Sequence, residues 1–185
     1  LRRKLAKDLR LTEGKDHQFV WLVGCPLFQR DSISGQLEAF HHPFVCPEVS
    51  EVEGCRDLGA IGGLSYDLVL DGSEIGSGSI RCHDPEVQRQ VFRRLGMSDE
   101  KIDSDFGFFL EALGYGAPPH GGIALGVDRL VSILLGCDTI REVIAFPKNK
   151  KFQSLMDGAP AKVEDGKLSE LQLLCLAGDD EDEDN

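Results

Sequence analysis

The sequence predicts an α+β domain in which an antiparallel sheet is flanked by helices. Two local signals support this fold class. Asp71-Gly72 separates two strand-like segments, 65–70 and 73–83, and such a dipeptide is typical of a two-residue hairpin turn. Directly afterwards, Asp84-Pro85-Glu86 supplies a capping residue, a proline and an acid in the positions that favour the start of a helix.

The other elements follow from periodicity and from turn residues. Before the hairpin we expect the end of a charged helix over 1–11, a strand over 18–23, a short strand leading to His41 and an irregular loop over 45–63.

After the hairpin the signals alternate between helix and strand. The sequence predicts a helix over 85–95, a second helix from its cap Ser98 to Gly114, a strand over 121–127, a helix over 128–135 and a last strand over 143–146.

Composition places the chain among globular proteins. Of its 185 residues, 41% are hydrophobic and 28% charged, and no apolar run approaches the roughly 18 residues of a membrane helix, so no membrane partner is expected. The net charge is −12, and six of the negative charges lie in Asp179–Asp184. We therefore expect a domain over 1–176 and an acidic, disordered tail over 177–185.

Cysteine spacing argues against a zinc site. None of the six cysteines forms a C-x-x-C pair, so the thiols are expected to stay reduced and structural. The first residue is Leu1 rather than Met, and we expect the chain to be a piece of a longer product.

The second hairpin strand carries a candidate binding motif over Glu74–Arg81. Glycines at 76 and 78 would let a ligand lie against the backbone, while Arg81 binds a carboxylate and Glu74 holds a cation. Strict alternation puts Glu74 on the face opposite Arg81, although glycine-rich strands often bulge and redirect side chains. The alternative is an edge strand with a surface Glu and Arg.

Two further groups of residues are candidates. Gly126-Val127-Asp128-Arg129 ends a strand of small residues and opens a helix, where Arg129 can meet a phosphate or form an ordinary surface ion pair. His41-His42 are adjacent in an extended segment, so one can face a ligand while the other packs. The chain lacks the Gly-Lys-Ser/Thr of a phosphate-binding P-loop.

Five separated blocks together resemble the C-terminal part of the aspartyl-tRNA synthetases, of the bacterial and organellar type. The blocks are Phe40–Phe44, Tyr66–Leu70, Glu74–Asp84, Tyr115–Leu130 and Ile140–Lys148, and the resemblance covers nearly everything from Leu1 to Leu173. Their shared order and spacing make the resemblance specific.

The resemblance implies a class II catalytic fold and a two-step reaction. ATP and L-aspartate form aspartyl-adenylate, and the aspartyl group then passes to tRNA(Asp). It places His41, His42 and Arg81 at the bound aspartate, and it assigns Glu74 to ATP and its Mg²⁺. Gly126, Val127, Asp128 and Arg129 fall at the ATP site, and no catalytic nucleophile is implied.

The chain also departs from the family pattern. Gly76-Ser77-Gly78 stands where three glycines are expected, Asp71-Gly72 where Asn-Gly is, and Gly24-Cys25 where Asp-Phe is. Ser77 either crowds a ligand or points away. The first and second class II motifs, the anticodon-binding barrel and most of the inserted domain are missing, so these 185 residues alone should not aminoacylate.

Three hypotheses therefore stay open. The preferred one is the C-terminal segment of a complete ligase that forms a homodimer, located in the mitochondrial matrix or alternatively in a bacterial cytoplasm. The second is a truncated, non-catalytic binding or regulatory module, and the third is a non-functional fragment. Lys148, Lys150 and Lys151 form only a small basic cluster, so we expect tRNA(Asp) to be held mainly by the absent N-terminal regions.

Overall fold

A computed structural model describes residues 1–11, 14 and 16–174 of the chain. The chain forms two compact units, Leu1–Leu130 and a second that begins at Val131, and each is described by itself. The expected acidic tail, 177–185, lies outside the described residues. The expected boundary of one domain over 1–176 stays a prediction.

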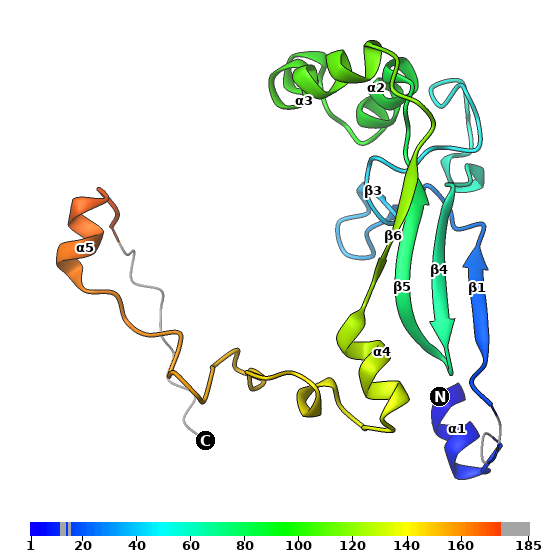
Figure 1. The fold of residues 1–185 in the computed structure, drawn as a ribbon. Coiled ribbons are helices and arrows are strands. Elements are labelled where there is room, and N and C mark those ends of the chain that lie inside the picture. Colours follow the sequence, from blue (N-terminus) through cyan, green and yellow to red (C-terminus); the bar gives the residue numbers. More distant parts are fainter. Residues whose placement is uncertain (12–13, 15, 175–185) are drawn as a thin grey trace. The chain divides into compact units, whose positions relative to one another are not determined.

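A four-stranded antiparallel sheet organises the first unit (Figure 1). Its order is β1 (Phe19–Val23), β4 (Ser65–Leu70), β5 (Ser73–Ile80) and β6 (Gly121–Leu125). A separate two-stranded sheet pairs β2 (Phe28–Arg30), which the sequence did not predict, with β3 (Leu37–Ala39). The predicted α+β class is confirmed.

The hairpin between β4 and β5 turns at Asp71-Gly72, as predicted. Both residues have left-handed backbone angles, with φ of 50° and 78°, which matches the two-residue turn that continues the twist of the strands. The carboxylate of Asp71 also accepts from the backbone N–H of Gln18 at 2.9 Å and lies 2.7 Å from His17 Nδ1. These contacts lower the pKa of Asp71 and tie the turn to the segment before β1.

A β-bulge interrupts β5 and changes which side chains share a face. Leu68 pairs with Gly76 but Val69 pairs with Glu74, so Ile75 is an extra residue in the ladder. Because Asp67 and Val69 lie on one face of β4, their partners Ser77 and Glu74 share that face too. Strict alternation, which separates Glu74 from Ser77, is therefore wrong here.

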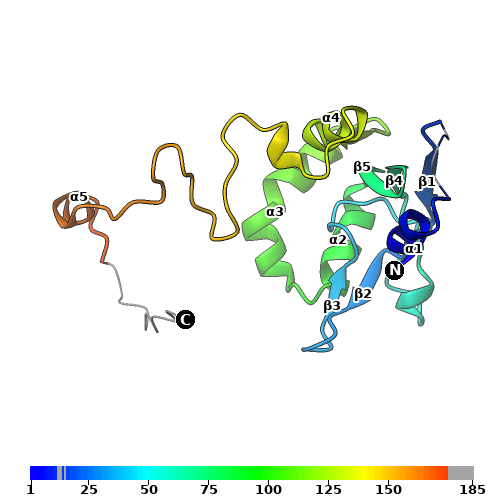
Figure 2. The ribbon, with the colours of Figure 1, turned by 90° about the horizontal axis from the view of Figure 1, so that it is seen from below.

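Two helices follow β5 and pack side by side (Figures 1 and 2). They are α2 (Pro85–Arg94) and α3 (Asp99–Gly114). The predicted caps are confirmed, since Asp84 accepts from two N–H groups of α2 and Ser98 accepts from Lys101 N. Rings from both helices meet Phe44, which lies 6.0 Å from Phe92, 5.9 Å from Phe106 and 5.5 Å from Phe109 between centroids.

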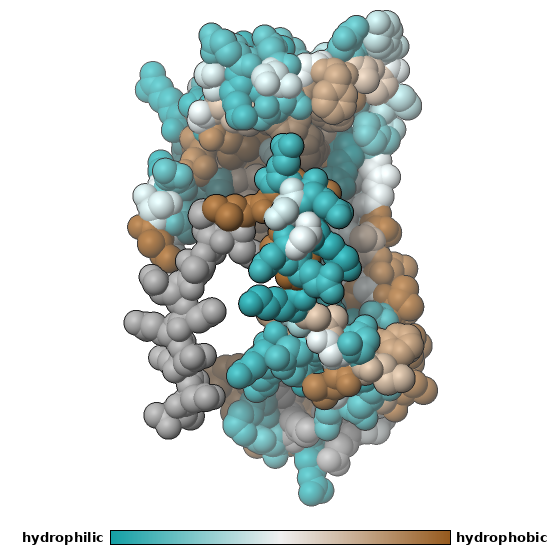
Figure 3. All heavy atoms as spheres, turned by 90° about the vertical axis from the view of Figure 1, so that its left-hand side faces the viewer, coloured by the Kyte–Doolittle hydropathy of each residue, from teal (hydrophilic) through white to brown (hydrophobic). Residues whose placement is uncertain are grey.

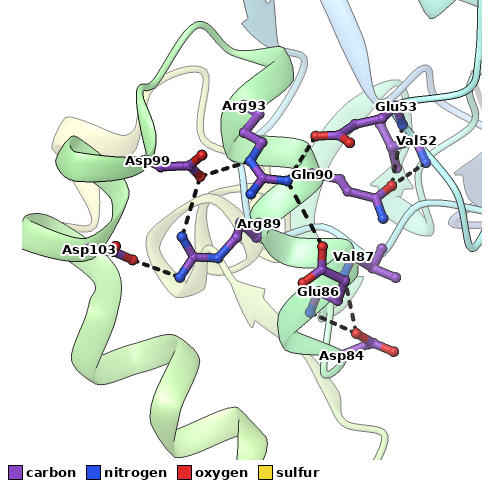
Figure 4. A network of polar contacts seen from close by, with 10 residues as sticks. All are labelled: Val52, Glu53, Asp84, Glu86, Val87, Arg89, Gln90, Arg93, Asp99 and Asp103. Atoms are coloured by element: carbon purple, nitrogen blue, oxygen red, sulfur yellow. Dashed lines mark hydrogen bonds and ion pairs between the residues drawn. The ribbon is translucent and has the colours of Figure 1, made fainter.

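Charged side chains bridge the same two helices (Figure 4). Arg89 contacts Asp103 at 2.7 Å, and Arg93 contacts Asp99 at 2.8 Å and Glu53 at 3.2 Å. Arg93 thereby lowers the pKa of the Asp99 carboxyl. Exposed ion pairs contribute little to stability individually, so the aromatic contacts hold these helices together more than this network does.

Shorter helices complete the chain. In the first unit α1 (Arg2–Asp8) precedes β1, and a 3₁₀ turn (Leu58–Ala60) lies inside the expected irregular loop. Helix α4 (Val127–Leu134) follows β6 after Gly126, and the division into two units falls within it, after Leu130. The second unit contains a 3₁₀ turn (Ile140–Glu142) and α5 (Asp165–Glu170). No helix in the described part of the chain is long and apolar enough to cross a membrane.

The strand expected over 143–146 is wrong. Thr139 caps the 3₁₀ turn before it, and the N–H of Val143 returns to Ile140 O at 3.1 Å, which closes that turn. No strand in the described residues pairs with 143–146. Strand propensity is expressed only where a neighbouring strand can accept the hydrogen bonds, and this segment has none beside it.

The apolar side chains of the sheet remain partly open. Edge strand β1 exposes every side chain, from 48% for Leu22 to 71% for Val23, and Ile123 and Leu125 of β6 are 41% and 51% exposed. Hydrophobic residues, in brown, are visible at the surface in Figure 3. Patches of this kind mark surfaces that other protein segments cover.

Candidate functional site

One polar cluster lies just beyond the end of β5. Arg81 Nη1 lies 3.0 Å from Nδ1 of His42 and also contacts Nε2 of the same ring. Val45 pairs with Arg81 in an antiparallel bridge, and the N–H of Cys46 donates to Ile80 O at 2.9 Å. The backbone pairing of the two segments thus brings Arg81 and His42 together, although they are 39 positions apart in the sequence.

The loop that carries His42 is anchored on the helices. Phe44 is held in the aromatic cluster of α2 and α3, and Gln88, which is fully buried, donates from Nε2 to Pro43 O at 2.8 Å. The backbone N–H of Phe44 donates to His42 Nδ1 at 3.2 Å. Because the two residues that follow His42 are anchored, and Phe44 N donates to its ring, the imidazole is held in place before any ligand binds.

The ring of His42 is held in its neutral form. Burial lowers its pKa below the ordinary value of 6.5, and the positive charge of Arg81 lowers it further. Nδ1 accepts from Phe44 N, and Nη1 of Arg81 lies beside both ring nitrogens. The cluster therefore presents the positive charge of Arg81 beside a neutral imidazole.

His41 lies differently from its neighbour. Its side chain is exposed and packs edge-on against Phe40, with ring centroids 4.9 Å apart. The structure thus brings His42 together with Arg81 and leaves His41 outside their contact. The predicted role of His41 at the bound aspartate stays a prediction.

A second polar cluster lies at the beginning of β5. Arg129 of α4 donates from Nη1 to the backbone oxygen of Glu74, and the same Nη1 lies 4.0 Å from Glu74 Oε1. Both side chains are about half exposed, at 52% and 53%. The backbone contact fixes the guanidinium, while the loose ion pair leaves the carboxylate able to bind another cation.

The remaining predicted residues form the junction of β6 and α4. The N–H of Gly126 donates to Ile75 O at 2.8 Å, which ties this junction to the bulge of β5. Val127 and Asp128 follow in the exposed first turn of α4. A helix N-terminus favours anions because its first N–H groups have no partner within the helix, and Arg129 adds a full positive charge.

Between the two clusters β4 and β5 present a polar face that sequence reasoning did not identify. Ser65 lies opposite Ser79, and Asp67 opposite Ser77. The hydroxyls of Ser65 and Ser79 and Oδ1 of Asp67 are buried without a hydrogen-bond partner among the described residues. In the sequence, the signal that could have indicated this face was Asp67, a single acid within an otherwise apolar strand. Buried unpaired polar atoms are rare in folded proteins and indicate a missing ligand or water.

The glycines of β5 pack closely against neighbouring protein atoms. A Cβ at Gly78 would lie 2.2 Å from Gly122 O and 2.6 Å from Tyr66 Cε2, and one at Gly76 would lie 2.8 Å from Leu125 Cδ2. The space beside them is filled by protein atoms on the apolar face of the sheet. On this face protein atoms leave no room for a ligand beside Gly76 and Gly78, and Ser77 is the residue that faces the polar side. The expectation that a ligand lies against the backbone of these glycines stays a prediction.

The two clusters are separated by the length of β5. Arg81 and Glu74 are seven positions apart, and strand rise gives roughly 20 Å between them. No small ion spans that distance. The arrangement fits an extended ligand, or two ligands in line, with a negative group near Arg81 and another near Arg129.

Comparison with known proteins identifies the family. The family model described as "tRNA synthetases class II (D, K and N)" matches residues 4–150, which is most of the chain. The chain belongs to this family of class II tRNA synthetases. The predicted class II resemblance is confirmed.

Two curated relatives are bacterial proteins much longer than this chain. An "Aspartate--tRNA(Asp/Asn) ligase" of Acidobacterium capsulatum is 52% identical over 180 residues, covering 94% of this chain but 30% of its own length. An "Aspartate--tRNA ligase" of Macrococcus caseolyticus is 46% identical over 174 residues, covering 94% of this chain and 29% of its own length. The chain thus spans about a third of the relatives it matches.

Solved synthetase structures agree with the fold. The asparaginyl-tRNA synthetase of Entamoeba histolytica, solved with asparaginyl-adenylate, has a TM-score of 0.53 at 24% identity, and the match covers 82% of this chain and 28% of that one. At this level of identity the likeness supports the class II fold only.

The described residues also bear on the magnesium ion that the resemblance implies beside ATP. They contain no cluster of three or more His, Cys, Asp or Glu side chains arranged to hold a metal. Magnesium, however, is commonly bound by one or two carboxylates together with substrate phosphates. Glu74 and the unpartnered Asp67 lie on one face of the sheet, so these two carboxylates fit an ion that arrives with a nucleotide.

Proposed function

We propose that the chain supplies part of the catalytic domain of an aspartate–tRNA ligase, which activates L-aspartate with ATP and transfers it to tRNA(Asp). The observation that supports this most strongly is the polar face between two separated clusters that each contain an arginine, Arg81 with His42 and Arg129 with Glu74. An aspartate and an ATP placed in line fit such a face, and the relatives named aspartate–tRNA ligases are about half identical.

In this proposal each cluster binds one substrate. Arg81 forms a charge-assisted pair with a carboxylate of aspartate beside the neutral ring of His42, and His41 lies nearby on the same loop. Arg129 and the first turn of α4, with Gly126, Val127 and Asp128, bind the phosphates of ATP.

Glu74, with Asp67, would hold the magnesium ion, which offsets the charge of the phosphates when bound. The chain itself then works by positioning. A carboxylate oxygen of aspartate attacks the α-phosphorus of ATP, and the bond from that phosphorus to the leaving pyrophosphate breaks. This step requires no nucleophile from the protein, in agreement with a site built from arginines, acids and a neutral imidazole.

The partners of the whole protein are also proposals. We assign the main tRNA(Asp)-binding surface and the homodimer contact to regions outside this chain, because the chain covers about 30% of the length of its relatives. The relatives compared above are bacterial, which favours a bacterial cytoplasm and gives no support to the mitochondrial matrix. The Acidobacterium capsulatum relative is named for both Asp and Asn tRNAs, and this name suggests that the protein charges tRNA(Asn) as well. The Macrococcus caseolyticus relative is named without that second tRNA.

Aspartate-dependent exchange of pyrophosphate into ATP tests the proposal. The assay compares the 185-residue chain with a chimera in which this chain replaces the matching segment of the Acidobacterium capsulatum ligase. We expect exchange from the chimera and none from the chain alone. A folded chimera without exchange would refute the catalytic assignment and favour a binding module, whereas exchange by the chain alone would show that the site is already complete.

Variants of the chimera test the two clusters separately. Arg81→Ala should lower kcat/KM for aspartate by about 30- to 900-fold, which corresponds to losing roughly 2–4 kcal/mol of a charge-assisted pair. Arg129→Ala should act mainly on the KM for ATP. Arg56→Ala is the matched control, because Arg56 is exposed and makes no polar side-chain contact within the described residues. Equal losses in all three variants would contradict the assignment.

A further inference from the structure

The second unit carries a compact basic turn over Lys148–Ser154, here called the lysine turn. Its two ends pair in an isolated antiparallel bridge between Lys148 and Ser154. Within a chain of net charge −12, this turn holds three lysines in four positions and no acid. The proposed adenylation chemistry uses none of its residues.

Asn149 fixes the shape of the turn. Its Oδ1 accepts from the backbone N–H groups of Lys151 at 2.8 Å and Gln153 at 3.0 Å. Its backbone oxygen accepts from Phe152 N at 3.0 Å, and its Nδ2 donates to Gln153 Oε1 at 2.9 Å. The turn is therefore held by its own hydrogen bonds.

The backbone of Phe152, in the lysine turn, has an unfavourable conformation. Its φ is +60°, a left-handed conformation that a bulky side chain seldom adopts, and its side chain is 77% exposed. A glycine or asparagine would occupy this position without the same steric cost. Outliers of this kind concentrate where a side chain has a function, so the exposed ring is a candidate contact residue.

Two of the lysine charges next to Phe152 in the sequence are free to bind a ligand. The Lys148 ammonium contributes to lowering the pKa of the Asp157 carboxyl, so part of its charge is already compensated. Lys150 and Lys151 are exposed, and neither ammonium has a hydrogen bond or ion pair within the described residues. The turn thus presents an aromatic ring directly after two uncompensated positive charges.

We propose that the lysine turn binds single-stranded RNA, with Phe152 stacking on a base and with Lys150 and Lys151 meeting phosphates. Rings beside cations recognise single strands because every base has a flat face and every linkage a negative charge. The partner class rests on the proposed function, in which tRNA supplies the RNA. Since the chain as a whole is strongly acidic, this contact is weak and adds to RNA binding by other regions of the protein.

Fluorescence anisotropy with the full 185-residue chain tests this directly. The probe is a fluorescein-labelled single-stranded RNA of about 12 nucleotides, titrated at several salt concentrations from about 25 to 200 mM. We expect Phe152→Ala to weaken binding about fivefold or more without changing the salt dependence, and Phe152→Tyr to retain binding. Lys150→Gln with Lys151→Gln should reduce the slope of log affinity against log salt by about 1.4.

Matched controls separate the turn from general surface effects. Phe108→Ala removes another exposed phenylalanine, one that is 76% exposed on α3, and Lys162→Gln removes an exposed lysine of the second unit. Neither should change RNA binding. Phe152→Gly should relieve the left-handed conformation and raise the melting temperature while weakening binding, a combination that a packing role for the ring does not produce.

The outcomes are distinct. Absence of RNA binding by the parent chain, or equal binding by the parent and the Phe152 and lysine variants, would overturn the proposal. So would destabilisation by Phe152→Gly, which would show that the ring is covered by protein instead of RNA. The titration contains neither ATP nor aspartate, so its failure is independent of the pyrophosphate exchange that tests the proposed function.

Discussion

Replacing Gly78 with alanine should weaken the pairing between β5 and β6, because the new methyl group has no space. Its Cβ would lie 2.2 Å from Gly122 O, 2.6 Å from Tyr66 Cε2 and 3.0 Å from Ile123 Cα. Two of these three atoms belong to the backbone of the neighbouring strand, so relief requires a shift of about 1 Å in β6. Overpacking of this kind costs about 1–3 kcal/mol.

The measurement is urea unfolding of the 185-residue chain, followed by the fluorescence of Trp21. This is the single tryptophan of the chain, and its ring lies 6.0 Å from that of Tyr66, one of the residues the methyl group would strike. With a urea dependence of about 2 kcal/mol per molar, the midpoint should fall by roughly 0.5–1.5 M.

Gly122→Ala is the matched control on the partner strand. A Cβ at Gly122 has no atom within 4 Å, so this variant should keep the midpoint or raise it slightly, since alanine loses less conformational entropy on folding. If Gly78→Ala were as stable as the parent chain, or if both variants lost equal stability, the packing argument would be refuted.

Three further predictions concern stability and reactivity. Asp84→Ala removes an N-cap that accepts from Glu86 N at 2.8 Å, and it should cost about 1 kcal/mol, readable as a lower urea midpoint; Asp84→Asn should retain most of that stability. Because the pKa of His42 is lowered on folding, the unfolded chain binds more protons below about pH 6.5, so stability should fall as the pH drops through that value. His42→Gln should flatten that part of the curve, and an unchanged pH profile would show that the ring titrates normally. Burial raises the pKa of Cys82 to about 12, so iodoacetamide at pH 8, followed by peptide mass mapping, should label Cys82 more slowly than Cys25.

Local signals located most of the elements because each depends on neighbouring residues. Asp71-Gly72 adopts left-handed angles wherever it occurs in a tight hairpin, and Asp84 caps a helix through N–H groups two and three positions away. The same logic failed over 143–146, where the residues favour a strand but no neighbouring strand is beside them. The short strand before His41 was predicted, but its partner β2 was missed because three residues carry too little pattern.

In the candidate site, too, the sequence indicated the chemistry of single residues, and the tertiary structure decided which of them are in contact. The residue types at Arg81, Glu74 and Arg129 indicated anion and cation binding, and the family resemblance gave each a substrate. The choice of His42 over His41 as the contact of Arg81 required the three-dimensional pairing of Val45 with Arg81.

The sequence by itself therefore determined the fold class, the family and the chemical character of the two clusters, because these depend on residue types and on short-range spacing. Only the tertiary structure decided which side chains share a face. The bulge at Ile75 turns Glu74 to the side of Asp67 and Ser77, and protein atoms fill the space beside Gly76 and Gly78. Both features depend on hydrogen-bond register between strands, a non-local property in which a shift of one residue reverses every side chain.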